Sequence, residues 1–371
     1  MKYYLLLLIF LSPACSWASY FFSPVGSQEA FLGNSGVGLL CSPGSPLYNP
    51  AGLGFCEYQL NLTVSGTAIA YQEMQDPAFH NQTGSFTSST LLTSAIFSVD
   101  EKIKTGFFYS YPANIDNTFR VEDSSGGVTA KVVRFQGAQA GLSYGALTNE
   151  TMAWGFSVAF TWNEMTTDSV INTVSAGTTT SLNQKRFEQQ NYITLNPGFV
   201  WRARDDYSIG ATLQWRALNI YSEGDLYQNQ LSTGDTQATE TFGRYTPHTD
   251  SILGVTVGQV FRFSDKTFLF DMSYAPQFAL PSTPVEQQSD LSLFNVSTGI
   301  KIPVRSVRWL VGGNYTQISN QSISMLSTGI NYNNRTYEAN FGLYYKYSQN
   351  REVGASNSDT LGFMYSSSVN Y

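Results

Sequence analysis

The stretch that decides the fold is the end of the chain, Asp359-Thr360-Leu361-Gly362-Phe363-Met364-Tyr365-Ser366-Ser367-Ser368-Val369-Asn370-Tyr371. Read alternately, one set of residues is mainly apolar and aromatic, and the set between is mainly small or polar. Side chains of a β-strand alternate between two faces, so this period of two predicts a strand with one apolar and one polar face. Such a strand, aromatic at its end, is the unit of a transmembrane β-barrel; an edge strand of a soluble sandwich is the alternative.

The composition favours the barrel. Charged residues make up 13% of the chain, about half the share in a typical soluble protein, which indicates that much of the surface does not meet water. No stretch after the N-terminus approaches the ~20 consecutive apolar residues of a spanning helix. The aromatic share of 15% suits the girdles that barrels place at both membrane interfaces. A net charge of -7 without a Lys/Arg cluster argues against nucleic acid as a partner.

The N-terminus is typical of a secretory signal over residues 1–18. Lys2 precedes an apolar core from Leu5 to Leu11, and Ser16-Trp17-Ala18 has small residues at its first and third places, which predicts cleavage after Ala18. Export without a later stop-transfer helix predicts the bacterial outer membrane, with the periplasm or the cell exterior as alternatives. Anchoring through an acylated Cys15 is a further alternative.

Alternation recurs from Tyr58 to the end of the chain and predicts an all-β protein, an antiparallel barrel of about fourteen strands. We expect strands at 58–71, 87–99, 103–113, 131–146, 152–164, 187–202, 206–221, 243–263, 266–276, 290–302, 307–318, 322–332, 335–348 and 358–371. In the clearest of them the lipid-facing residues are Tyr207, Ile209, Ala211, Leu213 and Trp215, and the inward-facing residues are Ser208, Gly210, Thr212, Gln214 and Arg216.

The connections alternate in length. Tight polar turns are expected at 100–102, 148–150, 203–205, 264–265 and 333–334, and long polar loops at 72–86, 114–130, 165–186, 222–242, 277–289 and 349–357. Short connections on one side and long ones on the other are the rule for outer-membrane barrels. An even strand count that starts and ends on the short-turn side leaves both termini in the periplasm.

Residues 19–57 are expected to form a plug inside a barrel of residues 58–371. The run from Ser42 to Gly54 is so rich in Pro and Gly that it forms neither a helix nor a central strand. A barrel of fourteen strands lies between eight-stranded barrels, which side chains fill, and the 16–18-stranded porins, so its lumen leaks unless it is occupied. Once the signal is removed, Cys41 and Cys56 are the remaining cysteines. An oxidising compartment favours a disulfide of roughly 3 kcal/mol, with two buried free thiols as the alternative.

Two stretches resemble the FadL family. Gly33-Asn34-Ser35-Gly36, followed by Tyr48-Asn49-Pro50-Ala51-Gly52-Leu53, is similar to that family's N-terminal hatch, whose signature is an Asn-Pro-Ala-Gly loop after a Gly/Ala-rich run. Ile193-Thr194-Leu195-Asn196-Pro197-Gly198-Phe199-Val200-Trp201-Arg202 looks like the family's mid-barrel hairpin. The resemblance implies a fourteen-stranded outer-membrane barrel, plugged by its N-terminus, that passes long-chain fatty acids or aromatic hydrocarbons inward. The hatch motif is shared with PorV-like accessory barrels of protein secretion.

The candidate substrate-binding and gating residues are Phe21, Phe22, Phe31, Asn49, Pro50, Ala51, Gly52 and Pro197. The resemblance implies that the N-terminus reaches the ligand pocket, which singles out Phe21 and Phe22; packing of the plug is the alternative. Asn49 can bond to its own backbone and Pro50 fixes a bend, which suits a rigid knuckle in the hatch. Pro197 removes a ladder hydrogen bond and Gly198 beside it packs nothing, which indicates a bulge or a lateral exit.

The leading hypothesis is facilitated diffusion of small hydrophobic molecules, and the alternatives are a PorV-like accessory barrel that binds proteins and a simple diffusion porin. The polar loops 165–186 and 222–242 depart from the apolar insertions with which family transporters capture cargo. No catalytic site, metal or cofactor is expected, because the histidines His80 and His248 stand outside any Cys/His/Asp cluster. The expected partners are outer-membrane lipid, hydrophobic small molecules and, through the strand that ends at Tyr371, the barrel-assembly machinery.

Deletion of residues 19–57 is expected to leave a folded, heat-modifiable barrel with a steady leak, because the plug and not the wall closes the lumen. Gel mobility and bilayer conductance check this outcome. An unfolded product would show that the segment is structural core.

Overall fold

The computed structural model describes residues 24–75, 82–87, 91–122, 128–175, 178–233, 237–246, 252–276, 292–318, 321–334, 336–350 and 357–371. Short helices come first, and they are α1 (Gln28–Phe31), α2 (Ser45–Tyr48) and the 3-10 helix η2 (Pro50–Phe55). No helix in these ranges has the length and apolar character needed to cross a membrane.

Strands make up most of the described chain after the hatch residues. The strands are β1 (Leu60–Gln75), β2 (Gln82–Thr87), β3 (Leu91–Ser98), β4 (Ile103–Glu122), β5 (Val128–Asn149), β6 (Met152–Ser175), β7 (Thr178–Arg204), β8 (Tyr207–Ser232), β9 (Thr239–Tyr245), β10 (Ile252–Phe263), β11 (Lys266–Ala275), β12 (Leu293–Val304), β13 (Val307–Ile318), β14 (Gln321–Asn333), β15 (Tyr337–Asn350) and β16 (Asn357–Asn370).

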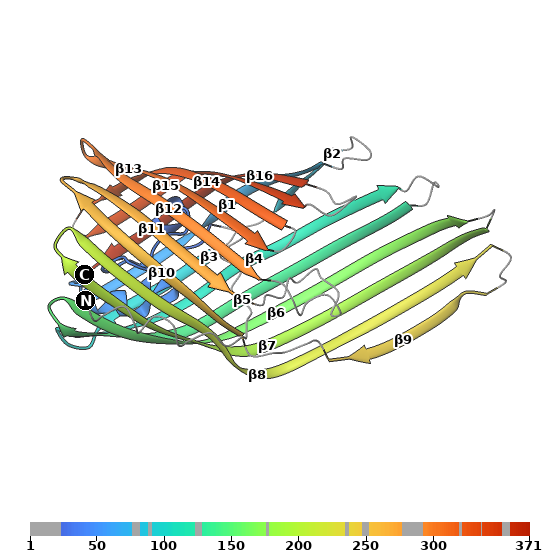
Figure 1. Ribbon diagram of the computed structural model, residues 1–371, viewed down its shortest axis with the longest axis horizontal. Coiled ribbons are helices and arrows are strands. Elements are labelled where there is room, and N and C mark those ends of the chain that lie inside the picture. The colour runs from blue at the N-terminus through green and yellow to red at the C-terminus, as the bar shows by residue number, and fades with distance from the viewer. Residues whose placement is uncertain are drawn as a thin grey trace, which may run out of the picture.

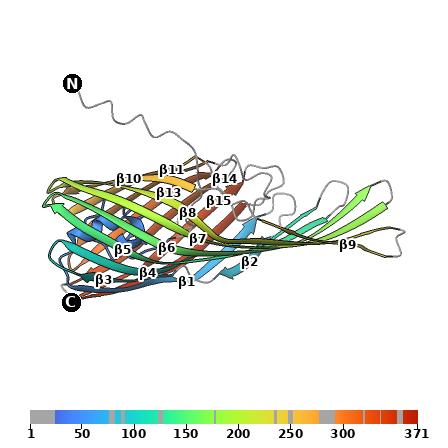
Figure 2. The same cartoon turned by 90° about the horizontal axis from the view of Figure 1, so that it is seen from below.

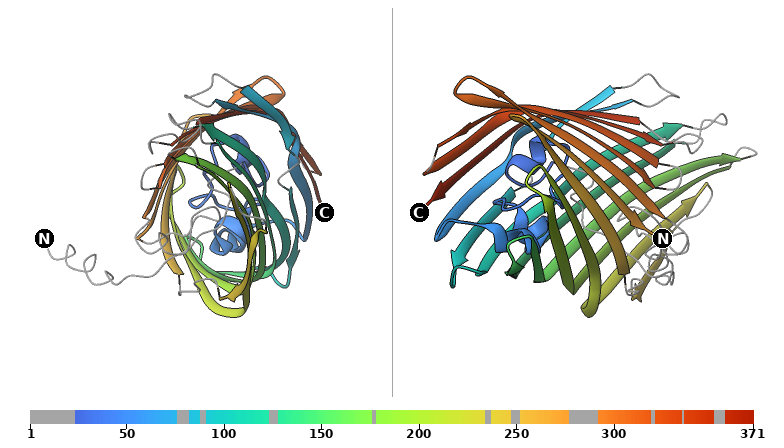
Figure 3. Two further views of the ribbon diagram at one scale, coloured as in Figure 1. Left: turned by 90° about the vertical axis from the view of Figure 1, so that its right-hand side faces the viewer. Right: turned by 60° about the vertical axis from the view of Figure 1, so that its left-hand side comes forward.

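These strands form one closed antiparallel barrel, seen end-on in Figure 3. From β3 to β8 and from β10 to β16 each strand pairs with the next, and β1–β3, β8–β10 and β16–β1 complete the circle, so the ring has no open edge. Fourteen strands make the ring, as predicted, and the short β2 and β9 are additions to β1 and β8. Tight turns such as 205–206, 264–265 and 305–306 gather at one end with the C-terminus (Figure 1), and we name this the turn end and the opposite one the far end.

The two faces of the wall follow the predicted alternation. In β16, Leu361 and Phe363 are exposed on the outside, whereas Gly362, Met364 and Ser366 are buried on the inside. In β8, the residues predicted to face inward are all buried, and they are Ser208, Gly210, Thr212, Gln214 and Arg216. The outer surface of the barrel is therefore apolar and aromatic over most of its circumference, and the polar side chains point into the lumen.

The barrel is much taller on one side than on the other. β6, β7 and β8 contain 24, 27 and 26 residues, whereas β11, β12 and β13 contain 10, 12 and 12. A spanning strand needs about 9–11 residues, so the long strands continue well past any bilayer. Figures 1 and 2 show β4 to β9 projecting beyond the rest of the far end, and we name this projection the tall wall.

The tall wall corrects several sequence-based expectations. The ranges 114–130, 165–186 and 222–242, predicted as long loops, are mostly strand, and the predicted strand 243–263 is divided between β9 and β10. In 165–186 and 222–242 most of the described side chains are exposed or partly exposed, so no buried apolar face marks these strands. Cross-strand polar pairs hold them together instead: Arg244 Nε lies 3.5 Å from Asp225 Oδ1 on the neighbouring strand.

The segment from Pro24 to Glu57, which we name the hatch, fills the lumen at the turn end (Figure 3). It fits because the wall has glycines where the hatch backbone comes closest. A Cβ added at any of them would overlap hatch atoms, and the closest cases are Gly145, Gly155, Gly198, Gly210, Gly258, Gly299, Gly312 and Gly329. Gly145 pairs with Gly155, and Gly155 with Gly198, so part of this set forms a continuous row across strands. The expectation that Gly198 packs nothing is wrong, since Asn49 and Pro50 lie against it.

Substitution of Gly210 by Leu is expected to displace the hatch, because the new Cβ would overlap the carbonyl of Val37. Overpacking of this kind costs about 1–3 kcal/mol, so we expect a lower free energy of unfolding together with a raised bilayer conductance. Gly243→Leu is the matched control, since a Cβ added at Gly243 has nothing within 4 Å. Equal conductance of the two variants would contradict the close fit.

Candidate functional site

The hatch is held by opposite sides of the barrel. Its first part, residues 24–35, which we name the N-lobe, contacts β12 to β16: Ser327 Oγ donates to the Phe31 carbonyl at 3.0 Å and accepts from the Gly33 N–H at 3.2 Å. The hydroxyls of Ser27 and Ser366 lie 2.8 Å apart. Small polar side chains of the wall thus make hydrogen bonds to backbone groups of the N-lobe that regular secondary structure does not pair.

The second part, residues 41–56, which we name the C-lobe, contacts β3 to β8. Ser94 Oγ donates to the Pro43 carbonyl at 2.9 Å, and the hydroxyls of Ser143 and Ser157 both donate to the Pro46 carbonyl, at 3.1 and 3.0 Å. These serines donate to backbone carbonyls of the C-lobe, whose Pro-rich chain cannot pair with the wall as a β-strand would. The C-lobe is therefore fixed to the wall opposite the N-lobe.

Residues 36–40 link the lobes along β8 to β11. The buried carboxylate of Asp271 accepts from the N–H groups of Gly36 and Val37 at 2.7 and 2.9 Å. Ser208 Oγ donates to the Gly38 carbonyl at 2.9 Å. Hydrogen bonds to a carboxylate are stronger than neutral ones, so Asp271 is a principal anchor of this link.

The knuckle predicted at Asn49 and Pro50 sits where the C-lobe meets the link. Asn49 Nδ2 donates to the carbonyls of Val37 at 2.8 Å and of Phe199 at 3.1 Å, and its Oδ1 accepts from the Ala51 N–H at 3.1 Å. It also caps η2, in which Pro50 occupies the first turn. Asn49 thus joins the link, the C-lobe and strand β7 through one side chain.

The ends of the C-lobe are joined to each other. Cys41 and Cys56 form a disulfide with a Cα–Cα distance of 4.8 Å. The Cys41 N–H donates to the Gly52 carbonyl at 3.1 Å, which closes the loop further. The hydroxyl of Tyr58 lies 3.0 Å from Cys41 Sγ and 3.3 Å from Cys56 Sγ. The C-lobe is consequently a closed ring with the Asn49 knuckle inside it.

A buried acid, Glu29, lies between the lobes, and sequence reasoning missed it. Its side chain is 0% exposed, accepts from the Ser27 N–H at 3.0 Å and bonds to the hydroxyl of Ser42 on the C-lobe. Burial raises the pKa of this carboxyl to about 7, although the nearby Lys301 opposes the rise. An acid directly before the apolar Ala30-Phe31-Leu32 run was the available signal.

The face of the hatch toward the far end is apolar. There Val25, Leu47 and Tyr48 pack into one buried cluster with wall residues, and the wall residues are Leu92, Phe108, Ala159, Ala275, Leu293 and Ile318. We name this cluster the apolar layer. Phe31 belongs to the neighbouring cluster below it and is 0% exposed, packed against Gly329. The apolar layer joins the hatch to both sides of the wall, through β3, β4 and β6 on one side and β11, β12 and β13 on the other.

The inner wall beyond the apolar layer is polar. Arg216 stacks over the ring of Tyr192 at 4.0 Å and donates to Gln190 at 3.1 Å, while Asn163 donates to the Tyr192 hydroxyl at 3.1 Å. These side chains follow the inner face of β6, β7 and β8. A molecule that enters from the far end thus meets hydrogen-bonding groups before it meets the apolar layer.

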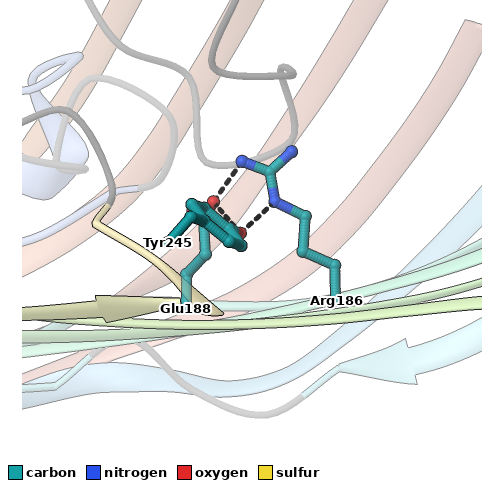
Figure 4. A network of polar contacts seen from close by, with 3 residues as sticks. All are labelled: Arg186, Glu188 and Tyr245. Carbon is teal, nitrogen blue, oxygen red and sulfur yellow. Dashed lines mark hydrogen bonds and ion pairs between the residues drawn. The ribbon is translucent and has the colours of Figure 1, made fainter. Parts of the chain in front are cut away.

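Further out, a charged cluster fastens β9 to the tall wall. Figure 4 shows Arg186 and Glu188 of β7 together with Tyr245 of β9. Tyr245 donates to Glu188 at 2.5 Å, and Arg186 bonds to both partners. Gly224 of β8 lies beneath the Tyr245 ring, and this allows the ring to reach across β8. The cluster stabilises the edge of the tall wall.

The remaining candidate residues are distributed as follows. Phe21, Phe22, His80 and His248 lie outside the described residues. Pro197 lies in β7, where the register to β8 is the same before and after it, so the predicted bulge is wrong there. The side chain of Thr212 bonds to the Pro197 carbonyl at 3.2 Å. In the described ranges no group of three or more His, Cys, Asp or Glu residues is placed to hold a metal.

The fold and the hatch define a class, the plugged fourteen-stranded barrels. The P. putida toluene transporter TodX is similar over 94% of this chain and 99% of its own, at 12% identity and a TM-score of 0.70. The monoaromatic hydrocarbon channel CymD is similar over 94% of this chain and 97% of its own, at 13% identity and a TM-score of 0.66. A Pseudomonas aeruginosa FadL homologue is similar over 94% of this chain and 98% of its own, at 11% identity and a TM-score of 0.65. No family profile and no curated protein matches the sequence. The chain has the FadL-type fold, which the two motifs implied.

Substitution of Asn49 by Ala is expected to loosen the hatch, because the bonds to Val37, Phe199 and Ala51 are lost together. Each such loss costs about 1 kcal/mol, and more where a buried group stays unpaired, so the local cost is on the order of 2–4 kcal/mol. Chymotrypsin cleavage within the hatch is expected to accelerate at least tenfold in the folded protein. Asn183→Ala, at an exposed position on β7, is the control, and equal cleavage of the two variants would contradict the role of Asn49.

Proposed function

We propose that this protein is an outer-membrane channel that takes up small hydrophobic molecules, such as long-chain fatty acids or aromatic hydrocarbons, by facilitated diffusion. The observation that carries the proposal is the apolar layer, which places Val25, Leu47 and Tyr48 of the hatch at the base of the lumen. The proteins of similar fold include a toluene transporter and a monoaromatic hydrocarbon channel. Uptake needs no chemical reaction, because binding of an apolar molecule is favourable by itself: each Å² of apolar surface moved out of water contributes about 25 cal/mol.

The route begins at the far end. Cargo passes the polar lining around Tyr192 and Arg216 and reaches the apolar layer, where the described hatch begins at Pro24. Phe21 and Phe22 directly precede this point in the sequence, and we assign them to contact with the cargo. Phe31 supports the layer from below. Asn49, Pro50, Ala51 and Gly52 hold the hatch closed beneath it.

The proposed location is supported by the exposed aromatics of the barrel and by the signal-like residues 1–18. Exposed aromatics such as Trp154, Trp201 and Trp309 lie close to the tight turns, and Tyr274 and Tyr315 lie nearer the far end, as expected for girdles at two interfaces of a bilayer. Residues 1–18 direct export, and the strand that ends at Tyr371 is recognised by the barrel-assembly machinery. The turn end then faces the periplasm and the tall wall faces the exterior.

A second candidate is an accessory barrel that binds proteins at its outer rim. It is favoured by aromatic and apolar side chains on β8 and β9 of the tall wall: Phe242, Leu231 and Tyr227 are 63%, 45% and 37% exposed. Tyr227 and Phe242 are directly opposite each other in the ladder, which makes them one patch. A simple porin is disfavoured, because the glycines of the wall fit the hatch closely.

Binding of a radiolabelled long-chain fatty acid to the reconstituted protein tests the proposal. We expect saturable binding that weakens at least tenfold in Leu47→Asn, which puts an amide into the apolar layer, and in a Phe21→Ala/Phe22→Ala variant. Leu218→Asn is the control, because Leu218 is exposed on β8 outside the lumen. Absence of saturable binding to the wild-type protein would refute the channel and favour the accessory barrel.

A further inference from the structure

The two lobes of the hatch meet in the middle of the lumen. The N-lobe bonds mainly to β12–β16 and the C-lobe to β3–β8. Val25 of the N-lobe packs with Leu47 and Tyr48 of the C-lobe, and two hydrogen bonds of side chains also join the lobes. Glu29 of the N-lobe bonds to Ser42 of the C-lobe, and Tyr48 of the C-lobe donates to the Val25 carbonyl at 2.7 Å. The link at residues 36–40 connects them through the chain.

Glu29 lies at the centre of this boundary. Positions 26, 36 and 44 of the hatch are glycines, and a Cβ added at any of them would crowd the Glu29 side chain. Both lobes are thus shaped around one carboxyl group. Other titratable groups approach it from each element packed there, and they are Lys301 of β12, Glu338 of β15, Tyr48 of α2 and Tyr58. Lys301 bonds to Gln28, and Glu338 accepts from Asn331 at 3.0 Å and Asn340 at 3.2 Å.

We propose that Glu29 is a proton-controlled latch between the two lobes of the hatch. With a neutral carboxyl group the lobes stay packed and the lumen is closed. With an ionised carboxylate the lobes separate more readily, and a path opens between them from the apolar layer to the turn end. The proposal rests on the proposed channel for its use, because the path is the exit for cargo from that layer, yet ions alone suffice to test it.

The direction of the pH effect follows from linkage. In the packed hatch the pKa of Glu29 is about 7, and in water, where the separated lobes leave it, the value is 4.5. The packed form is therefore fully favoured below pH 4.5 and loses about tenfold for each pH unit up to 7. Above pH 7 both forms are ionised and the loss stays constant.

Ion conductance of the reconstituted protein in planar bilayers between pH 5 and 9 tests the latch. For the wild type we expect a low conductance at pH 5, a several-fold rise up to about pH 7 and a plateau beyond. Glu29→Gln keeps the shape of the neutral acid; its amide oxygen can accept from Ser27 and its NH2 can donate to Ser42, but it cannot ionise, so its conductance stays low throughout. Glu57→Gln, at an exposed position at the end of the hatch, is the matched control and keeps the wild-type profile.

Two results would overturn the latch: a wild-type conductance that does not change with pH, or a Glu29→Gln conductance that rises with pH as that of the wild type does. Ser42→Ala gives an independent reading, since it removes the partner in the C-lobe and is expected to raise conductance already at pH 5. Heat-modifiable gel mobility shows that each variant is folded. Fatty-acid binding at pH 5 reports on the channel proposal separately, because the latch is closed there.

Discussion

The structure depends on one steric constraint, the direct contact between the hatch backbone and a wall that has no side chains at those points. A barrel of fourteen strands has a lumen too wide for its own side chains to fill, and the hatch has too little regular structure to stand alone. Glycines such as Gly155, Gly198 and Gly210 let the two backbones approach each other. Serines and Asp271 then satisfy the polar groups that this approach would otherwise bury without partners.

From this contact the rest of the architecture follows. The hatch presents Val25, Leu47 and Tyr48 toward the far end and thereby completes an apolar layer that neither the wall nor the hatch forms alone. The same close fit holds the lobes against opposite sides of the wall, and Glu29 lies buried where they meet. The bonds of Glu29 to Ser42 and of Tyr48 to Val25 join the lobes there. The closed lumen is a consequence of the same packing.

Much of the barrel was predictable from sequence because its signal is local. The alternation in β16 and β8 places apolar residues outside and polar residues inside, and the structure confirms both faces. The tall wall was missed for a related reason: residues 165–175 and 178–186 pair along their length, but most of their described side chains are at least partly exposed, so no apolar face marks them. The alternation of apolar and polar residues reveals a strand with one buried face. It does not reveal that two strands pair with each other.

The site was predictable only in part, because its contacts join distant segments. The Asn49-Pro50 turn carries its own chemistry and was found, whereas its seat against Gly198 was not, since nothing in either stretch refers to the other. Glu29 presents the same difficulty, because its partner Ser42 and its glycine surroundings come together only when the hatch is folded.

Hydrogen exchange of the hatch in the reconstituted protein, read by mass spectrometry, tests the central contact most directly. We expect amides of residues 29–38 and 43–52 to exchange as slowly as those of the barrel strands, because wall and hatch groups satisfy them in a closed lumen. Exchange within seconds, as in the exposed turns at 205–206 and 264–265, would show that the hatch does not pack against the glycines and would contradict the account.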